Sequence, residues 1–245
     1  CHSDGNGGAV FICKRKITNT SDEQLSIHNY LDTQYCCFTN CSMYQSGFYG
    51  GVMYIAAQNT NLSFVSTVKC VSDSPTTPEG ALFDIQADTQ ISSSNVNITE
   101  GRSTYCAGIE YRNSKNGYFK FQTMSNLVGK FATAFTNLHT NVSIELCNYV
   151  NTFVTWPEDS LDNAGVINVR DRSATISHFS FQNTTFANQK CFIASTNVLG
   201  TNVIITLIDC YSDTPDPYRY QQIGKTVNCN FNFKTNEVPM RDIEQ

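Results

Sequence analysis

One short phrase recurs along the 245-residue chain: one or two small residues followed by a short apolar run. From residue 50 onward the phrase returns at intervals of 25 to 32 residues. A period of this size is typical of a solenoid, in which one repeat cannot bury its apolar face alone and stacks on its neighbours. The instances are residues 7–12, 50–55, 80–85, 107–111, 132–135 and 164–169.

A second apolar run follows each phrase after a polar turn. Several of these runs alternate apolar with polar residues, which is the pattern of a strand with one buried face. No segment keeps the helical spacing for three turns, and a repeat near 28 residues is too short for a propeller blade. We therefore predict an all-β chain, folded as a right-handed parallel β-helix of about seven coils. The predicted second strands are 62–68, 91–98, 118–121, 142–146, 174–181 and 203–208.

The repeat predicts one domain over residues 1–245. Residues 1–49 form an irregular first coil with an N-terminal cap, with a predicted strand at 24–28. Residues 50–208 form the regular coils, and 209–245 form a C-terminal cap or extension with a strand at 227–233. Glycine tolerates the backbone conformations of tight corners, so we expect the glycines there.

Composition excludes some classes of partner. Charged residues make up 15% of the chain, against a usual value of about 25%, and the net charge is −5. The chain has no basic run, so it lacks the positively charged patch that binds nucleic acid or an anionic membrane. No apolar run approaches the roughly 18 residues that a membrane-spanning helix needs, so we expect no membrane insertion.

Eleven cysteines are more than a reduced cytosolic domain of this size carries. Together with six N-glycosylation sequons, they favour an oxidising compartment and hence a secreted or cell-surface glycoprotein. The sequon asparagines are Asn19, Asn40, Asn61, Asn97, Asn141 and Asn183.

Cys41 and Cys70 lie at nearly the same phase of two successive repeats. Stacked coils would place their Cα atoms about 4.8 Å apart, which a disulfide tolerates, so we predict this pair. A pairing with Cys36 or Cys37 is the alternative. The odd total leaves at least one thiol unpaired or bonded to another chain. The candidates for that role are Cys1, Cys13 and Cys229.

The sequence offers no metal site and implies no cofactor. The four histidines lie far apart, and none has a ligand-like spacing to a cysteine. The nearest approach to a metal motif is Cys37 with Cys41, and the disulfide interpretation is favoured for these two residues.

An enzyme must be weighed, because many parallel β-helices cleave polysaccharides with carboxylates from neighbouring coils. Five charged residues follow the first strands of three repeats and could line one face. The chain lacks the short carboxylate motifs of the polygalacturonase-like family, so we interpret these residues as solvated charges at strand edges and expect no enzyme. They are Asp84, Glu110, Arg112, Arg170 and Asp171.

The repeats resemble the coils of polymorphic-membrane-protein-type β-helices. The resemblance rests on the small-residue phrases at 7–10 and 50–53 and on Phe38, Asn40 and Cys41 in the segment Phe-Thr-Asn-Cys. It spans about residues 7 to 210, although most coils lack the second glycine. It implies an adhesive or structural role at a cell surface.

We therefore expect an extracellular, glycosylated, non-enzymatic structural or adhesive protein. The ends of a β-helix leave strand edges that can template pairing with another chain, so subunits are expected to associate end to end into a filament or surface coat. The first alternative is a monomeric adhesin ectodomain that binds a receptor or glycan. The second is an enzyme of the polysaccharide lyase or hydrolase type.

Overall fold

The computed structural model describes the strands of the chain and several of the connections between them. The described part is all-β, with 21 strands and no helix. Every strand pairing in it is parallel, and the sheet does not close on itself. The described residues are 2–3, 10–13, 30–43, 51–72, 81–112, 115–129, 132–134, 141–155, 165–170, 177–187, 193–196, 203–213, 218–219 and 223–231.

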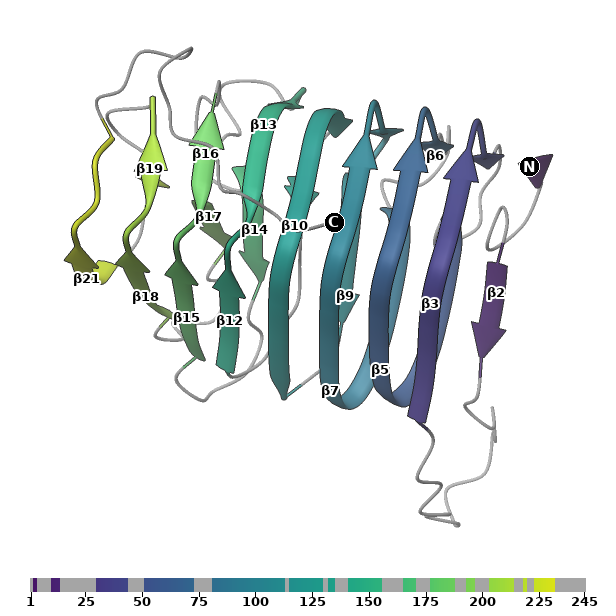
Figure 1. Cartoon of the computed structure of the whole chain (residues 1–245), viewed down its shortest axis with the longest axis horizontal. Coiled ribbons are helices and arrows are strands. Elements are labelled where there is room, and N and C mark those ends of the chain that lie inside the picture. Colours follow the sequence, from purple (N-terminus) through teal and green to yellow (C-terminus); the bar gives the residue numbers. More distant parts are fainter. Residues whose placement is uncertain are drawn as a thin grey trace.

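The strands form three rows, in which each strand pairs with its equivalent in the next repeat (Figure 1). The first row holds β2 (Val10–Cys13), the start of β5 (Met53–Val68), the start of β7 (Ala81–Thr99), β9 (Cys106–Arg112), β11 (Ala132–Ala134), β14 (Gly165–Arg170), β17 (Ile193–Thr196) and β20 (Tyr218–Arg219).

The second row holds β3 (Tyr30–Thr39), the remainders of β5 and β7, the start of β10 (Asn116–Gly129), β12 (Asn141–Glu145), β15 (Ser177–Gln182), β18 (Val203–Ile208) and β21 (Ile223–Val227). The third row holds β1 (His2–Ser3), β4 (Ser42–Met43), β6 (Val71–Ser72), β8 (Arg102–Ser103) and the ends of β10 and β13 (Asn148–Val154). The start of β13, β16 (Thr185–Ala187) and β19 (Tyr211–Ser212) continue the second row, because they are in register with the end of β3 and with its equivalents in β5, β7 and β10. Strands β5 and β7 belong to two rows because each bends from one into the next (Figure 1).

The recurring phrase is confirmed as the first row, since all six instances contain strands and these strands pair with one another. The six predicted second strands are likewise confirmed as parts of the second row, except that residues 174–176 of the fifth lie outside the described residues. The prediction at 227–233 is wrong in position, because β21 ends at Val227 and the backbone turns at Asn228. The predicted strand at 24–28 lies outside the described residues.

Thirteen corners in the described part of the chain are made by residues other than glycine, contrary to expectation. Gly50 and Gly80 lie outside the described residues. Thirteen described non-glycine residues have φ between 49° and 55°. Asparagine tolerates this conformation because its short side chain can hydrogen-bond locally. Larger residues are held there by the flanking strands, since the corner N–H groups still donate to carbonyls of the next repeat, as Leu146 does to Gln182 at 3.0 Å.

These thirteen residues fall into two sets whose members are in register with one another across the repeats. We call them the first-corner column and the second-corner column, in chain order. The second-corner residue lies five positions after the first-corner residue in each of the five repeats where both are described. The first-corner column is Tyr35, Phe64, Asn95, Phe121, Leu146, Asn183, Asp209 and Asn228. The second-corner column is Asn40, Lys69, Glu100, Asn126 and Asn151.

Glycine serves close packing instead. A Cβ atom on Gly51 would lie 2.4 Å from the Cβ atom of Ser72, and one on Gly101 would lie 2.6 Å from Leu82. No side chain fits at either position without a shift of its neighbours.

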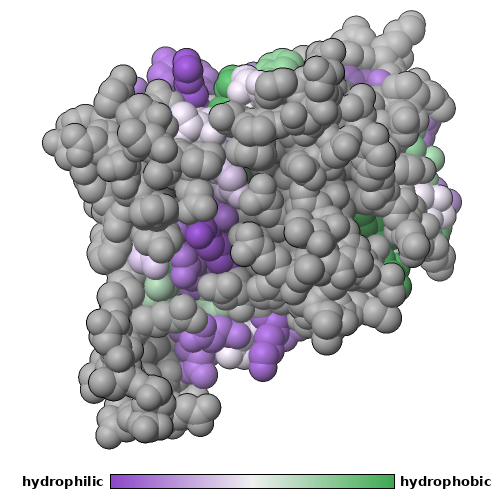
Figure 2. Space-filling view, turned by 180° about the vertical axis from the view of Figure 1, so that it is seen from behind, coloured by the Kyte–Doolittle hydropathy of each residue, from purple (hydrophilic) through white to green (hydrophobic). Residues whose placement is uncertain are grey.

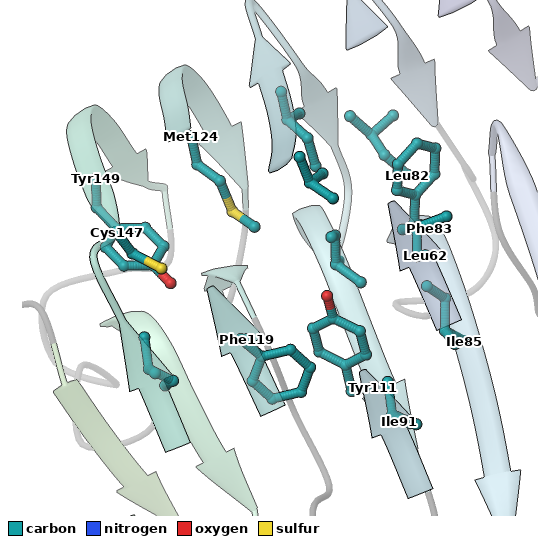
Figure 3. Close-up of a cluster of buried hydrophobic side chains, with 14 of the residues drawn as sticks. Leu62, Leu82, Phe83, Ile85, Ile91, Tyr111, Phe119, Met124, Cys147 and Tyr149 are labelled. Carbon is teal, nitrogen blue, oxygen red and sulfur yellow. The ribbon is translucent and has the colours of Figure 1, made fainter. Parts of the chain in front are cut away.

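The core lies between the rows and is filled by inward side chains of successive repeats (Figure 3). Aromatic rings stack within it, with centroids 4.2 Å apart for Tyr111 and Phe119. A buried polar group interrupts it: the Tyr111 hydroxyl donates to Ser93 Oγ at 2.9 Å, and Gln122 Nε2 donates to both oxygens. The two hydroxyls and the Gln122 amide nitrogen are thereby satisfied, whereas the buried Gln122 Oε1 has no hydrogen-bond partner among the described residues.

Candidate functional site

The first row is buried on both of its faces near the middle of the chain. In β5, Met53 and Ile55 point into the core, and Tyr54 between them is only 8% exposed. The equivalent residues of the next two repeats are Asp84 and Glu110, in register on β7 and β9. Their side chains are 0% and 1% exposed. The sheet therefore carries two adjacent carboxylates in a buried position.

Arg112 joins the two carboxylates. It lies two residues beyond Glu110 on β9, so its side chain is on the same face of the strand. Its Nη2 atom is 2.8 Å from Glu110 Oε2 and 3.3 Å from Asp84 Oδ2. The Arg112 side chain is 17% exposed, so it forms the more accessible part of this group. We call Asp84, Glu110 and Arg112 the ionic cluster.

The electrostatics of the ionic cluster keep the guanidinium charged. Burial alone disfavours the charged form, but the carboxylates of Asp84 and Glu110 together raise the pKa of Arg112 above its ordinary value. Two ionised carboxylates one strand apart repel each other, and the arginine between them offsets that repulsion. Such an arrangement ties two consecutive repeats together.

The ionic cluster corrects the sequence interpretation. Asp84 and Glu110 are buried, so they are not solvated charges at strand edges. The expectation that charged residues after the first strands meet on one face holds for these two residues and Arg112. Arg170 ends β14, but its side chain is not described, and Asp171 lies outside the described residues. Burial could not be foreseen, because alternation along a strand does not tell whether its outer face is covered.

Six of the described cysteines directly follow a corner residue, and we call them the corner cysteines. The thiol of each donates to the carbonyl oxygen two residues earlier, over 3.2 to 3.8 Å. A residue after a left-handed corner points inward, so these thiols belong to the core or pack against it. The sequence does carry a signal, since three of them end Asn-Cys or Asp-Cys dipeptides. The corner cysteines are Cys36, Cys41, Cys70, Cys147, Cys210 and Cys229.

Strand register places Cys41 opposite Cys70 on the next repeat, as the phase of the sequence predicted. The flanking pairs are Thr39 with Val68 and Ser42 with Val71. Both side chains are buried, and burial raises the pKa of Cys70. The two residues are thiols in this structure, so the disulfide between them stays a prediction.

The fully buried cysteines are poor nucleophiles. Burial, followed by the negative charge of Glu110, raises the pKa of Cys106 far above its ordinary value. Burial raises the pKa of Cys147 to about 12, although hydrogen bonds from its surroundings act in the opposite direction. Figure 3 shows this sulfur beside the hydroxyl of Tyr149. A reactive cysteine needs an accessible thiolate, which neither of these sites provides.

Five of the six sequon asparagines lie on described strands or corners, and none of the five is buried. Asn40 and Asn141 are exposed, while Asn61, Asn97 and Asn183 are half-buried. The amide nitrogen of Asn61 donates to Asp32 Oδ1 at 2.8 Å, and this is the atom that a glycan would take. Asn19 lies outside the described residues.

Within the described ranges, no group of three or more histidine, cysteine, aspartate or glutamate side chains is arranged to hold a metal ion. The same ranges contain no helix long and apolar enough to cross a membrane. No protein-family model matches this chain, and no curated protein or solved structure matches it either. The resemblance in residues 7–10 and 50–53 therefore stays a prediction.

Proposed function

We propose that the chain folds as a right-handed parallel β-helix and acts as an extracellular, N-glycosylated structural or adhesive protein, without enzymatic activity, whose copies associate end to end. Three rows of parallel strands in register, joined through repeated corners, support the β-helix. The association rests on one observation, the incomplete burial of the core at both ends of the stack.

At the N-terminal end, the inward residues of β3 are only half-buried. Leu31, Cys36 and Phe38 pack against the core, yet each stays partly exposed. Their equivalents in the next repeat are buried: Cys36, for example, lies opposite Val65, which is 0% exposed. The first described repeat thus leaves one side of the core uncovered.

The C-terminal end shows the same feature. Cys229 and Phe231 are half-buried, whereas Cys210 and Ser212 in the preceding repeat are fully buried. Figure 2 shows the molecule from behind, so the end with β18 and β21 lies on the right. Hydrophobic side chains are visible toward that end, while the middle of the described surface is largely hydrophilic.

The strand edges at the two ends are complementary. Within the part of the chain that the structure describes, β3 pairs only with β5, and β21 pairs only with β18. In a parallel stack, the outer edge of the last strand has the hydrogen-bonding pattern that the first strand of a second copy can continue. The contact is heterologous and builds an open filament unless its rotation closes. Glycans on Asn40 and Asn141 would keep the sides apart.

The ionic cluster is not assigned a catalytic role in this proposal. Its two carboxylates are at most 1% exposed, so a glycan could reach them only if the residues around them moved. Its contacts between consecutive repeats instead suit a part of the scaffold.

The proposal is tested with two variants that carry the same change. Phe231→Asp places a charge at the half-buried C-terminal end, and Phe153→Asp places it on β13, at a side chain that is already 46% exposed. The purified 245-residue chain and both variants are compared by light scattering over a range of concentrations and by negative-stain electron microscopy, with circular dichroism to verify folding.

We expect filaments from the natural chain and from Phe153→Asp, and single short rods from folded Phe231→Asp. Rods from the natural chain at every concentration would refute the association and favour the monomeric adhesin, for which a glycan array is the next assay. Filaments that persist in folded Phe231→Asp would refute the assignment of the joint to this end.

A further inference from the structure

Two corner cysteines occupy equivalent positions in the last two described repeats. Cys210 follows Asp209, and Cys229 follows Asn228, which are consecutive members of the first-corner column. On one side of the pair, the Asp209 N–H donates to the Val227 carbonyl at 2.9 Å. On the other side, the Asn230 N–H donates to the Cys210 carbonyl at 3.1 Å. Cys210 and Cys229 are therefore direct neighbours across the two repeats.

The two thiols point the same way. Cys210 Sγ is 3.4 Å from the Ile208 carbonyl oxygen, and Cys229 Sγ is 3.3 Å from the Val227 carbonyl oxygen. Equivalent contacts on neighbouring strands give the two side chains the same direction, toward the core. The two thiols are also hydrogen-bonded to each other. Neighbouring strands hold Cα atoms about 4.8 Å apart, within the range of about 4.4–6.8 Å that a disulfide tolerates.

We propose that Cys210 and Cys229 form a disulfide that ties the last repeat to the one before it. The inference rests on strand register and not on end-to-end association, so it holds or fails independently of the proposed assembly. It also gives Cys229, which the sequence offered as an unpaired thiol, a partner within its own chain.

The difference in exposure between the two cysteines decides which thiol reacts first with an oxidant. Cys210 is fully buried, and Cys229 is half-buried, so the oxidant meets Cys229 first. The hydrogen bond between the thiols lowers the pKa of Cys229 and raises that of Cys210, which favours the thiolate at the accessible position.

A low-molecular-weight disulfide such as glutathione disulfide supplies the oxidant. The Cys229 thiolate attacks one of its sulfurs, forms a mixed disulfide and releases one glutathione thiolate. Cys210 then loses its proton to solvent and attacks the Cys229 sulfur, which releases the second glutathione. Two protein thiols are oxidised, and one glutathione disulfide is reduced to two thiols.

The same column contains a matched internal control. Cys147 lies between Gln122 and Thr184, the equivalent residues of the repeats before and after it. It has the same inward direction, with its thiol 3.2 Å from the Glu145 carbonyl oxygen, but no cysteine beside it in the column. We expect it to stay reduced under conditions that oxidise Cys210 and Cys229.

The first test is peptide mapping of the 245-residue chain without substitutions. The folded chain is equilibrated with glutathione and glutathione disulfide, its free thiols are blocked with iodoacetamide under denaturing conditions, and it is digested with trypsin and Asp-N without reduction. These proteases separate residues 209–212, which hold only Cys210, from residues 226–234, which hold only Cys229. We expect these two peptides to be linked, and the link to disappear after reduction, while Cys147 is recovered with the blocking group.

Recovery of Cys229 with the blocking group, or its linkage to another cysteine, would overturn the proposal. The second test compares thermal unfolding with and without reductant. Reductant should lower the midpoint of the natural chain and of Cys147→Ser, and the reductant-dependent shift should be smaller in Cys229→Ser. An equal shift in Cys229→Ser would count against the pair. Because the mapping uses the natural chain, it remains decisive if a variant does not fold.

Discussion

Replacement of Arg112 by methionine probes the ionic cluster most directly. Methionine keeps much of the length of the arginine stem but removes the positive charge from between Asp84 and Glu110. Both carboxylates then remain buried, one strand apart, without the guanidinium. Removal of one partner from a buried ion pair typically costs about 3–5 kcal/mol, because it leaves an uncompensated charge.

The geometry supports a loss of that size. Two unit charges about 5 Å apart repel by about 3 kcal/mol at an effective dielectric constant of about 20. For a chain of this length, such a loss corresponds to a fall of roughly 10 °C in the unfolding midpoint. The assay is urea unfolding at pH 7, followed by circular dichroism. Arg102→Met is the matched control, because Arg102 is an exposed arginine of β8, and it should change the stability by less than about 0.5 kcal/mol.

The dependence on pH separates charge repulsion from lost packing. In Arg112→Met, the folded state binds protons at the buried carboxylates more readily than the unfolded state, so its stability rises as the pH falls. In the natural chain, Asp84 and Glu110 raise the pKa of Arg112, so the guanidinium stays charged below about pH 12. The difference between the two proteins should therefore shrink between pH 7 and pH 4. A loss below 1 kcal/mol at pH 7, or one independent of pH, would refute the electrostatic reasoning.

Three further predictions follow from the core and the corners. Gly51→Ala should lower the free energy of unfolding in urea by about 1–3 kcal/mol, because the new Cβ atom would meet the Cβ atom of Ser72. Adding Ser72→Gly should recover part of that loss. An unchanged unfolding midpoint in Gly51→Ala would contradict this packing. Burial raises the pKa of Tyr111 above its ordinary value of 10.0 and that of Cys147 from 9.0 to about 12. The folded state therefore retains protons that the unfolded state loses, and stability should fall as the pH rises above 9, whereas a flat profile from pH 8 to 11 would exclude this linkage. Leu146→Asn should stabilise the chain by about 0.5–1 kcal/mol, because asparagine adopts the left-handed corner at lower cost, and a lower unfolding midpoint would show that leucine packing outweighs strain.

Local patterns predicted the strands well. The alternation in 142–145 reports which residues face the core, since Val142 and Ile144 are buried. It fails in 62–68, where the backbone bends at Phe64, so that Phe64 is exposed and Thr67 is buried. The small-residue phrase predicted which strands stack, since its instances pair in register. Strands β17 and β20 were missed because neither begins with that phrase. Seven of the thirteen corner residues are asparagine or aspartate, which carry a local signal for a left-handed backbone. The other six are tyrosine, phenylalanine, lysine, glutamate or leucine, which carry no such signal.

The sequence by itself determined the strand pattern, the period of the repeat and the matching phase of Cys41 and Cys70. Only the tertiary structure decided that Asp84 and Glu110 are buried with Arg112, and that Cys210 lies beside Cys229. The physical reason is that these contacts depend on the register between repeats, whose first corners are separated by 19 to 37 residues. Connections of such unequal length leave that register undetermined until the strands stack and the core closes around them.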